Sequence, residues 1–167
     1  MMENTQDTKS PTIHLRQAQT DDAPLLVSIL HASFEEYRGQ FEPPPGVFRA
    51  STDSIRSEMQ QGQFIIAYVG ENAAGCVYFQ PYSDHVYLGH LAVLPAYRKQ
   101  GVARVLVDHV ERQTAALHLP GVQLGVRLVL PHLQAYYTRL GYRLLRYGTH
   151  EGFSQPTYAI MEKELPQ

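Results

Sequence analysis

The residues best suited to chemistry in this chain lie between positions 88 and 104, which read LGHLAVLPAYRKQGVAR. Gly101 has no side chain and Ala103 has a small one, so an anion can approach the backbone closely at this point. Three cations are close to them in sequence: Arg98, Lys99 and Arg104. This combination favours a site that binds phosphate groups.

The secondary-structure elements expected around this stretch would point its backbone N–H groups at one binding position. An apolar run over 86–94 predicts a strand ended by Pro95, and an apolar stripe at helical spacing runs from Val102 to Leu117. A helix that begins just after a strand points its free N–H groups and the positive end of its dipole at one place. Such a turn has the geometry to hold a phosphate or pyrophosphate. The simpler alternative is an ordinary helix start with solvated cations.

The rest of the chain predicts alternating strands and helices. Runs of β-branched, aromatic or alternating residues predict strands over 13–16, 64–69, 74–80, 86–94, 122–130, 143–147 and 157–161. Apolar residues at helical spacing predict helices over 21–37, 52–62, 102–117 and 133–141. The prolines in segment 40–46 exclude a helix there and predict a loop or lid.

Composition limits the classes of protein to consider. A chain of 167 residues, 44% hydrophobic and 18% charged, predicts one globular domain over 11–167 after a disordered tail over 1–10. Its net charge of -2 argues against nucleic acid as a partner, and no apolar run is long enough to predict a membrane span. Eight scattered histidines and a single Cys76, expected to be a small buried hydrophobe, predict no metal site. A cytoplasmic location is the default expectation.

Two motifs resemble a known family. The segment 98–103 matches the Q/R-x-x-G-x-G/A signature of the GNAT N-acetyltransferase superfamily, and 135–142 resembles that family's helix ending in Y-x-x-x-G-F/Y. The resemblance covers about residues 13–163. It implies an α/β fold with a mixed, strongly twisted sheet of six to seven strands, flanked by about four helices and splayed between the fourth and fifth strands.

The resemblance also implies acetyl-coenzyme A as cosubstrate. Main-chain groups of the strand at 86–94 would pair with the pantetheine arm, and the amides of the turn would hold the pyrophosphate. The residues expected to bind the coenzyme are Leu91, Ala92, Val93, Arg98, Lys99, Gln100, Gly101, Val102, Ala103 and Arg104. Tyr137 matches the family's tyrosine near the coenzyme sulfur and is the expected general acid, while the N–H of Val93 would polarise the thioester carbonyl.

An acceptor amine with a pKa of about 10 must lose a proton before it attacks, so a base is also needed. Where some family members carry Glu or His, this chain has Tyr87 and, two residues on, Gly89. His85 shares the side-chain parity of Tyr87 and titrates in the right range, whereas His90 has the opposite parity and is expected to pack against a helix.

Carboxylates near the expected acceptor loop are alternatives for the base: Glu35, Glu36 and Glu42. The chain lacks the Asn that many family members carry at the start of the last helix, because Leu130 and Pro131 occupy that region. The sequence therefore does not predict which residues of this region contact the pantetheine.

The expected acceptor site is aromatic and not strongly acidic. Tyr37, Phe41, His85 and Tyr87 would line it, close to the segment 150–153, which favours a small-molecule amine over a basic peptide. Two alternatives stay open: a coenzyme-binding module without activity, and a nucleotide-binding domain that prefers ATP or NAD. A monomer or homodimer is expected.

Overall fold

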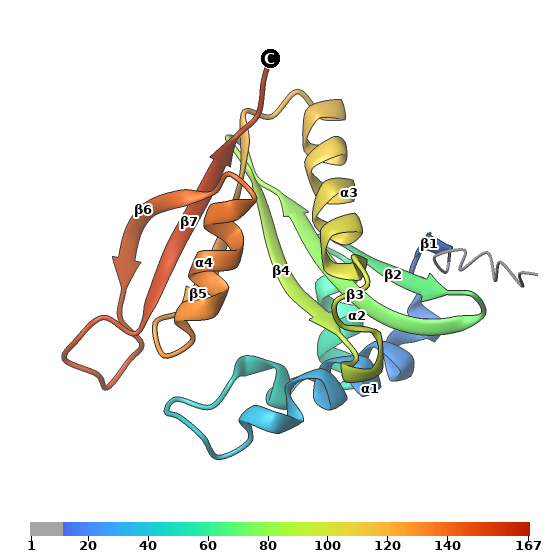
Figure 1. Ribbon diagram of the computed structural model, residues 1–167, viewed down its shortest axis with the longest axis horizontal. Helices are drawn as coiled ribbons and strands as arrows, with labels where there is room; N and C mark the ends of the chain where they lie inside the picture. The colour runs from blue at the N-terminus through green and yellow to red at the C-terminus, as the bar shows by residue number, and fades with distance from the viewer. Residues whose placement is uncertain (1–11) are drawn as a thin grey trace, which may run out of the picture.

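The computed structural model of the chain describes residues 12–167, and the tail predicted over 1–10 lies outside the described residues. Within them the strands are β1 (Ile13–Gln17), β2 (Gln63–Val69), β3 (Asn72–Pro81), β4 (Val86–Val93), β5 (Gly121–Arg127), β6 (Arg143–Gly148) and β7 (Tyr158–Glu164). The α-helices are α1 (Ala23–Phe34), α2 (Thr52–Met59), α3 (Val102–Ala116) and α4 (Pro131–Arg139). The short 3₁₀ helices are η1 (Thr20–Asp22), η2 (Glu35–Tyr37), η3 (Gly46–Arg49) and η4 (Pro95–Tyr97). The elements follow the predicted order (Figure 1).

The strands form one mixed sheet that opens in the middle. Their order in the sheet is β1-β2-β3-β4-β5-β7-β6, and neighbours are antiparallel except β4 and β5. These two run parallel and pair only through Val86 with Val122 and Tyr87 with Gln123, after which they diverge (Figure 1). The predicted α/β architecture, a seven-stranded sheet with four helices, splayed between the fourth and fifth strands, is confirmed.

Strand β5 is shorter than the predicted run over 122–130. It ends at Arg127, because the Leu128 amide donates to the carbonyl of Thr157 at 3.0 Å and the Leu130 amide turns back to the carbonyl of Arg127 at 3.1 Å. Pro131 then begins α4. Its missing N–H costs nothing there, because an N–H in the first turn of a helix has no helical acceptor. The early end leaves Arg127 at the open side of the splay.

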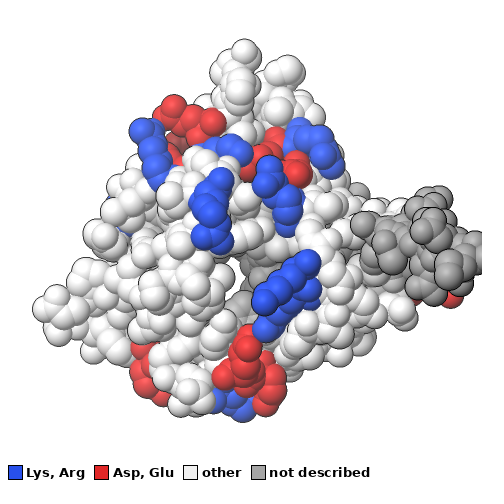
Figure 2. All heavy atoms as spheres, in the orientation of Figure 1, with Lys and Arg blue, Asp and Glu red and all other residues white. Residues whose placement is uncertain are grey.

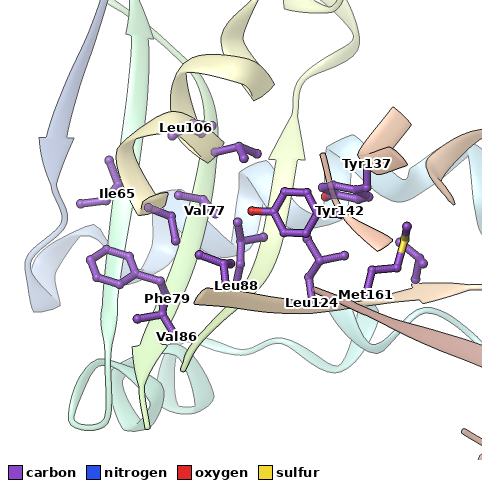
Figure 3. Close-up of a cluster of buried hydrophobic side chains, with 14 of the residues drawn as sticks. Ile65, Val77, Phe79, Val86, Leu88, Leu106, Leu124, Tyr137, Tyr142 and Met161 are labelled. Carbon is purple, nitrogen blue, oxygen red and sulfur yellow. The ribbon is translucent and has the colours of Figure 1, made fainter. Parts of the chain in front are cut away.

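Helices α3 and α4 cover one face of the sheet with a continuous apolar core. Figure 3 shows that this core crosses the splay: Leu88 and Leu106 belong to one half of the molecule, and Leu124 and Met161 to the other. Burying one such side chain stabilises the fold by roughly 1.5–3 kcal/mol. Side-chain packing therefore joins the two halves where backbone pairing between β4 and β5 has ended.

Helices α1 and α2 cover the opposite face. Leu26, Ile29 and Ile55 pack there against Phe64 and Cys76, all of them buried. Burial raises the pKa of the Cys76 thiol to about 12, so this residue acts as a small apolar side chain, as predicted.

Charges of both signs are mixed over the molecular surface that Figure 2 displays, and Lys and Arg do not merge into one basic field there. No helix among residues 12–167 is long and apolar enough to cross a membrane. The same residues contain no group of three or more His, Cys, Asp or Glu side chains placed to hold a metal ion.

Candidate active site

The turn before α3 forms a small basin at the helix N-terminus. Gly101 is the N-terminal cap, with a left-handed φ of 85°, and Lys99 has a φ of 62°. The first hydrogen bond of the helix runs from the Val105 amide to the carbonyl of Gly101 at 3.0 Å, so the preceding amides have no helical acceptor. A pocket of about 230 Å³ opens beside them, here called the helix-start pocket, lined by Val93, Tyr97, Arg98, Lys99, Gly101, Val102, Ala103, Arg104 and Tyr136.

Two side chains of the predicted coenzyme motif point to other partners. The Arg98 guanidinium donates to the carbonyl of Ser33 at 2.8 Å and pairs with Glu36 at 2.7 Å, so it ties this turn to the end of α1. Gln100 donates to the carbonyl of Ala96 at 3.2 Å and is not among the lining residues. Lys99 and Arg104 line the pocket together with Arg98, beside the free amides at the start of α3.

A β-bulge interrupts β4, the strand predicted to pair with the pantetheine arm. Cys76 of β3 pairs with Ala92, whereas Tyr78 pairs with Gly89, which leaves His90 and Leu91 as the extra residues. His90 has a φ of 48°, a left-handed conformation that is uncommon for a residue with a side chain. The bulge changes which face of the sheet each following residue occupies.

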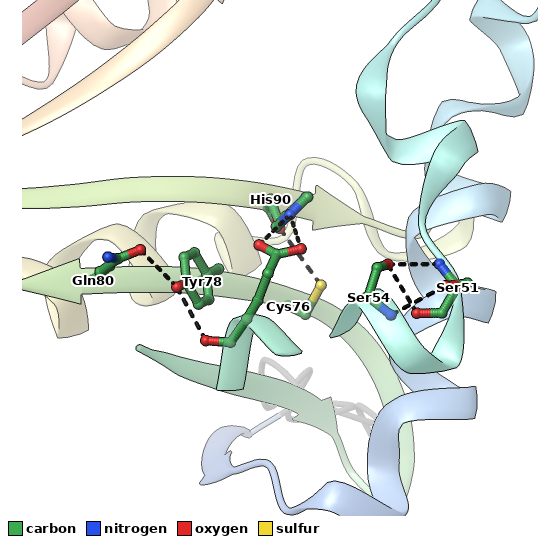
Figure 4. Close-up of polar contacts among 7 residues, drawn as sticks. Ser51, Ser54, Cys76, Tyr78, Gln80 and His90 are labelled. Atoms are coloured by element: carbon green, nitrogen blue, oxygen red, sulfur yellow. Dashed lines mark hydrogen bonds and ion pairs between the residues drawn. The ribbon is translucent and has the colours of Figure 1, made fainter. Parts of the chain in front are cut away.

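His90 consequently lies on the same face as Tyr87, and its predicted opposite parity is wrong because strict alternation fails at a bulge. The imidazole packs against α2 as expected: Nε2 lies 2.9 Å and 3.1 Å from the two carboxylate oxygens of Glu58 (Figure 4). The ring also stacks on Phe64, with centroids 5.7 Å apart. Its side chain keeps 22% of its surface exposed.

Between the diverging strands lies a second pocket of about 160 Å³, here called the interstrand pocket. It passes from the α4 side of the sheet to the α1 side. Its lining comes from α1, the loop after it, β4, β5 and α4: Phe34, Phe41, Pro45, Val47, Tyr87, Leu88, Gly89, His90, Leu91, Leu124, Gly125, Val126, Arg127, Leu130, Leu133 and Tyr137. No carboxylate is among them.

Tyr137 closes one end of the interstrand pocket. Its ring makes edge-to-face contacts with Tyr136 at 5.4 Å and Tyr142 at 5.7 Å, and only 6% of the residue is exposed. Its hydroxyl has no hydrogen-bond partner within residues 12–167. Burial raises the pKa of Tyr137, so the hydroxyl keeps its proton at neutral pH.

Tyr87 folds over β4 into the same pocket. A Cβ at Gly89 would lie 2.8 Å from the Tyr87 ring, so only glycine leaves room for this conformation. Burial, followed by the charge of Glu58, raises the pKa of Tyr87. Tyr87 is therefore a neutral hydrogen-bonding group rather than a base.

Other residues predicted for the acceptor site are placed differently. His85 pairs with Asp84 at 2.7 Å, stacks on Tyr82, and lines a separate hollow beside the start of β5. Tyr37 contacts Phe41, with ring centroids 6.0 Å apart, and stands next to the interstrand pocket without lining it. Its hydroxyl lies 3.4 Å from His132 Nε2 on α4.

The carboxylates considered as bases are not in the interstrand pocket either. Glu35 pairs with Arg38 at 2.9 Å, and Glu36 pairs with Arg98. Glu42 lines a neighbouring hollow together with Arg127.

Arg127 was not predicted as a site residue, although a lone arginine in an apolar strand is a usable signal. It donates from Nη2 to the carbonyl of Pro43 and from Nη1 to Nε2 of His150 at 3.0 Å. Its guanidinium lies 5.2 Å from the centre of the Phe41 ring. Arg127 thus connects β5 to the loop after α1 and to the loop that carries His150.

Several solved structures share this fold. The PaiA N-acetyltransferase of Thermoplasma acidophilum, in complex with coenzyme A, superposes with a TM-score of 0.76 at 16% identity, over 92% of this chain and 99% of that one. The ribosomal-protein-S18-alanine N-acetyltransferase of Escherichia coli gives 0.73 at 20% identity, over 93% and 96%. The IAA acetyltransferase of Bacillus cereus gives 0.67 at 14% identity, over 92% and 100%. At these identities the likeness is one of fold.

No curated protein matches the chain by sequence. The model of the acetyltransferase (GNAT) family, however, matches residues 26–142, which is more than half of the chain and includes the helix-start turn, β4, β5 and α4. The chain therefore belongs to the GNAT acetyltransferase family.

Proposed function

We propose that this protein is an N-acetyltransferase that moves an acetyl group from acetyl-coenzyme A to the primary amine of a small molecule, by direct transfer within a ternary complex. The observation that carries the proposal is the interstrand pocket. It brings Tyr137 and Leu91 into one space with the aromatic residues of the loop after α1. A donor held along β4 and an acceptor entering past that loop would meet there.

The coenzyme would be held mainly by backbone groups. Leu91 belongs to the bulge, and Ala92 and Val93 follow it; their main-chain groups on the open edge of β4 would pair with the pantetheine amides. The diphosphate would lie in the helix-start pocket on the amides of residues 101–104, with Lys99 and Arg104 adding charge. Arg98 would act indirectly, by fixing the turn to α1.

In the reaction a bond forms between the amine nitrogen and the acetyl carbon, and the bond from that carbon to sulfur breaks. Tyr137, kept protonated by burial, would donate its proton to the departing sulfur. The Val93 N–H would stabilise the negative charge that gathers on the carbonyl oxygen.

For the base we propose His90 in place of His85. His90 lines the interstrand pocket, and donation from its Nε2 to Glu58 leaves Nδ1 with the lone pair that can accept a proton from the ammonium. The Glu58 carboxylate also fixes the orientation of the ring through Nε2.

A small acceptor is favoured by the size and lining of the pocket. A volume of about 160 Å³ under a loop suits a compact molecule, and the lack of lining carboxylates does not favour a basic peptide. Phe34 and Phe41 provide apolar surface for a side chain.

Two measurements on the wild-type protein test the proposal. Calorimetry should detect binding of coenzyme A, and release of free thiol from acetyl-coenzyme A should depend on an added primary amine. Tight coenzyme binding with no turnover on a broad amine panel would instead favour a coenzyme-binding module without activity. Preference for ATP or NAD over coenzyme A would overturn the assignment altogether.

A further inference from the structure

Arg127, Arg49 and His150 lie close together at the end of β5, and no salt bridge to a carboxylate involves them within residues 12–167. Arg127 lines the pocket, and its donors face two neutral acceptors, the carbonyl of Pro43 and the imidazole of His150. No ion pair involves Arg127 or Arg49 within residues 12–167. Since the chain has 16 acidic residues, a surface cation could readily have been paired.

Arg49 adds a second positive charge. It lies at the end of η3, and its Nη2 is 3.4 Å from where a Cβ at Gly46 would stand, so its guanidinium folds back beside Gly46. Burial, and then the charge of Arg49, lowers the pKa of Arg127, while Glu42 raises it. Glu42 is close enough to moderate this positive field but forms no ion pair within the described part of the chain.

His150 does not neutralise the cluster. Burial, followed by the charges of Arg127 and Arg49, lowers the pKa of His150. Its ring is therefore neutral at physiological pH, which agrees with its position as acceptor of the Arg127 N–H. The imidazole and the Pro43 carbonyl are neutral acceptors that hold the guanidinium in place without forming an ion pair.

We propose that Arg127, assisted by Arg49, binds the carboxylate of the acceptor, so that the substrates are small apolar amino acids acetylated on their α-amine. This inference rests on the proposed function. A guanidinium matches a carboxylate with two parallel hydrogen bonds, and Arg127 shares the pocket with Tyr137 at the reacting end. The aromatic rings between them would contact the side chain of the amino acid.

Matched acceptors test the proposal on the wild-type enzyme. L-leucine, L-methionine and L-phenylalanine would each be compared with the corresponding carboxamide, decarboxylated amine and aminophosphonate. We expect kcat/KM for the amino acid to exceed that for the two acceptors without an anion by about 100-fold or more. Equal rates on the decarboxylated amines, or a preference for the phosphonates, would overturn the carboxylate assignment.

Variants locate the effect. The ratio of kcat/KM for L-leucine to that for its decarboxylated amine should fall by about tenfold or more in Arg127→Gln and by less in Arg49→Gln. Glu42→Gln should raise the ratio, because it removes the competing negative charge. Arg112→Gln removes an exposed arginine on α3 that lines none of the pockets and should leave the ratio unchanged.

Coenzyme A affinity serves as the folding control for each variant. If Arg127→Gln does not fold, the wild-type preference together with Arg49→Gln and Glu42→Gln still decides the question. An unchanged ratio in those two variants would overturn the role of the cluster. Complete inactivity toward all amines would overturn the proposed function, whereas good turnover of uncharged amines alone would overturn only this inference.

Discussion

At the scale of single residues, the site depends on side chains whose partners differ from those expected of their type. Tyr137 is buried, yet its hydroxyl donates to no group within residues 12–167. His90 adopts a left-handed backbone conformation and is held by Glu58. The left-handed backbone of His90 costs stability, and residues held in such strained conformations are typical of functional sites.

Tyr137→Phe removes the proposed acid and little else. We expect kcat to fall about 10²-fold or more, with coenzyme affinity unchanged, because general acid catalysis contributes factors of this order. Melting temperature should stay the same or rise slightly, since the lost hydroxyl has no hydrogen bond in the described structure. Steady-state kinetics and thermal unfolding check both parts, and an unchanged kcat would contradict the role of Tyr137.

His90→Asn tests the proposed base. Asparagine tolerates the left-handed conformation, so the bulge should persist while the titrating group is lost. We expect kcat to fall about 10²-fold or more and the acidic limb of its pH profile to disappear. His118→Asn is the matched control, because His118 is exposed and has a similar φ of 57°. Equal activity of the two variants would exclude His90 as the base.

At the scale of elements, two local departures from regular structure position the site. The bulge in β4 places His90 on the face of the sheet that α1 and α2 cover, and the left-handed Gly101 turns the chain into α3 with its first amides free. Each of these two departures contains a residue with a left-handed backbone: His90 in the bulge and Gly101 in the turn. Coenzyme binding should therefore be sensitive to the backbone of this turn.

Gly101→Ala separates binding from strain. Nothing lies within 4 Å of the added Cβ, so the direct cost is that of the left-handed φ, about 1–2 kcal/mol. Gly70→Ala is its control, since Gly70 has a φ of 61° and equal free space in the β2–β3 turn. Both variants should lose similar stability in urea unfolding, and Gly101→Ala alone should weaken coenzyme A binding in calorimetry. Equal affinities would argue against a diphosphate at this turn.

At the scale of the whole molecule, the sheet has two halves, β1 to β4 and β5 to β7. Backbone pairing joins them only through two residue pairs between β4 and β5, and side-chain contacts supply the remaining connection. Glu111 of α3 accepts from the Tyr142 hydroxyl and from Lys163 of β7, each at 3.1 Å. This network spans the splay on the α3 side, next to the buried core that also crosses it (Figure 3). We expect this hydrogen-bond network and the buried core together to set the separation between β4 and β5.

Tyr142→Phe removes one hydrogen bond of that network. The pair of Glu111 and Lys163 stays in place, so we expect a loss of about 0.5–1.5 kcal/mol, or a fall in Tm of roughly 2–4 °C per kcal/mol. Tyr147→Phe is the control, because Tyr147 is 55% exposed and should not change Tm. Differential scanning calorimetry measures both, and equal Tm values would contradict the role of the network.

Acid should destabilise the protein through two histidines. Burial, followed by the charge of Arg112, lowers the pKa of His109, and the pKa of His150 is lowered as described above. The unfolded chain then binds protons first, so this stability is present above a pH of about 6.5 and is lost as the pH falls below it. Urea unfolding between about pH 7.5 and 5.5 should show a smaller loss for His109→Gln than for the wild type. Equal losses would contradict the assignment.

The sequence alone was sufficient for the elements and for the residues whose role is local. Strand and helix order, the glycine cap at Gly101 and the position of Tyr137 on α4 follow from periodicity and from motifs of six to eight adjacent residues. Such features depend on interactions within a few residues along the chain, so they can be predicted from the sequence.

Only the tertiary structure decided which side chains meet in the interstrand pocket. One bulge moved His90 to the face of the sheet that α1 and α2 cover, and Arg98, which lines the helix-start pocket, also donates to the carbonyl of Ser33, 65 residues away. Arg127 and His150 came together from separate strands and loops. These placements depend on contacts between distant segments, and neither strand alternation nor residue type encodes them, because each is set by how the halves of the sheet pack.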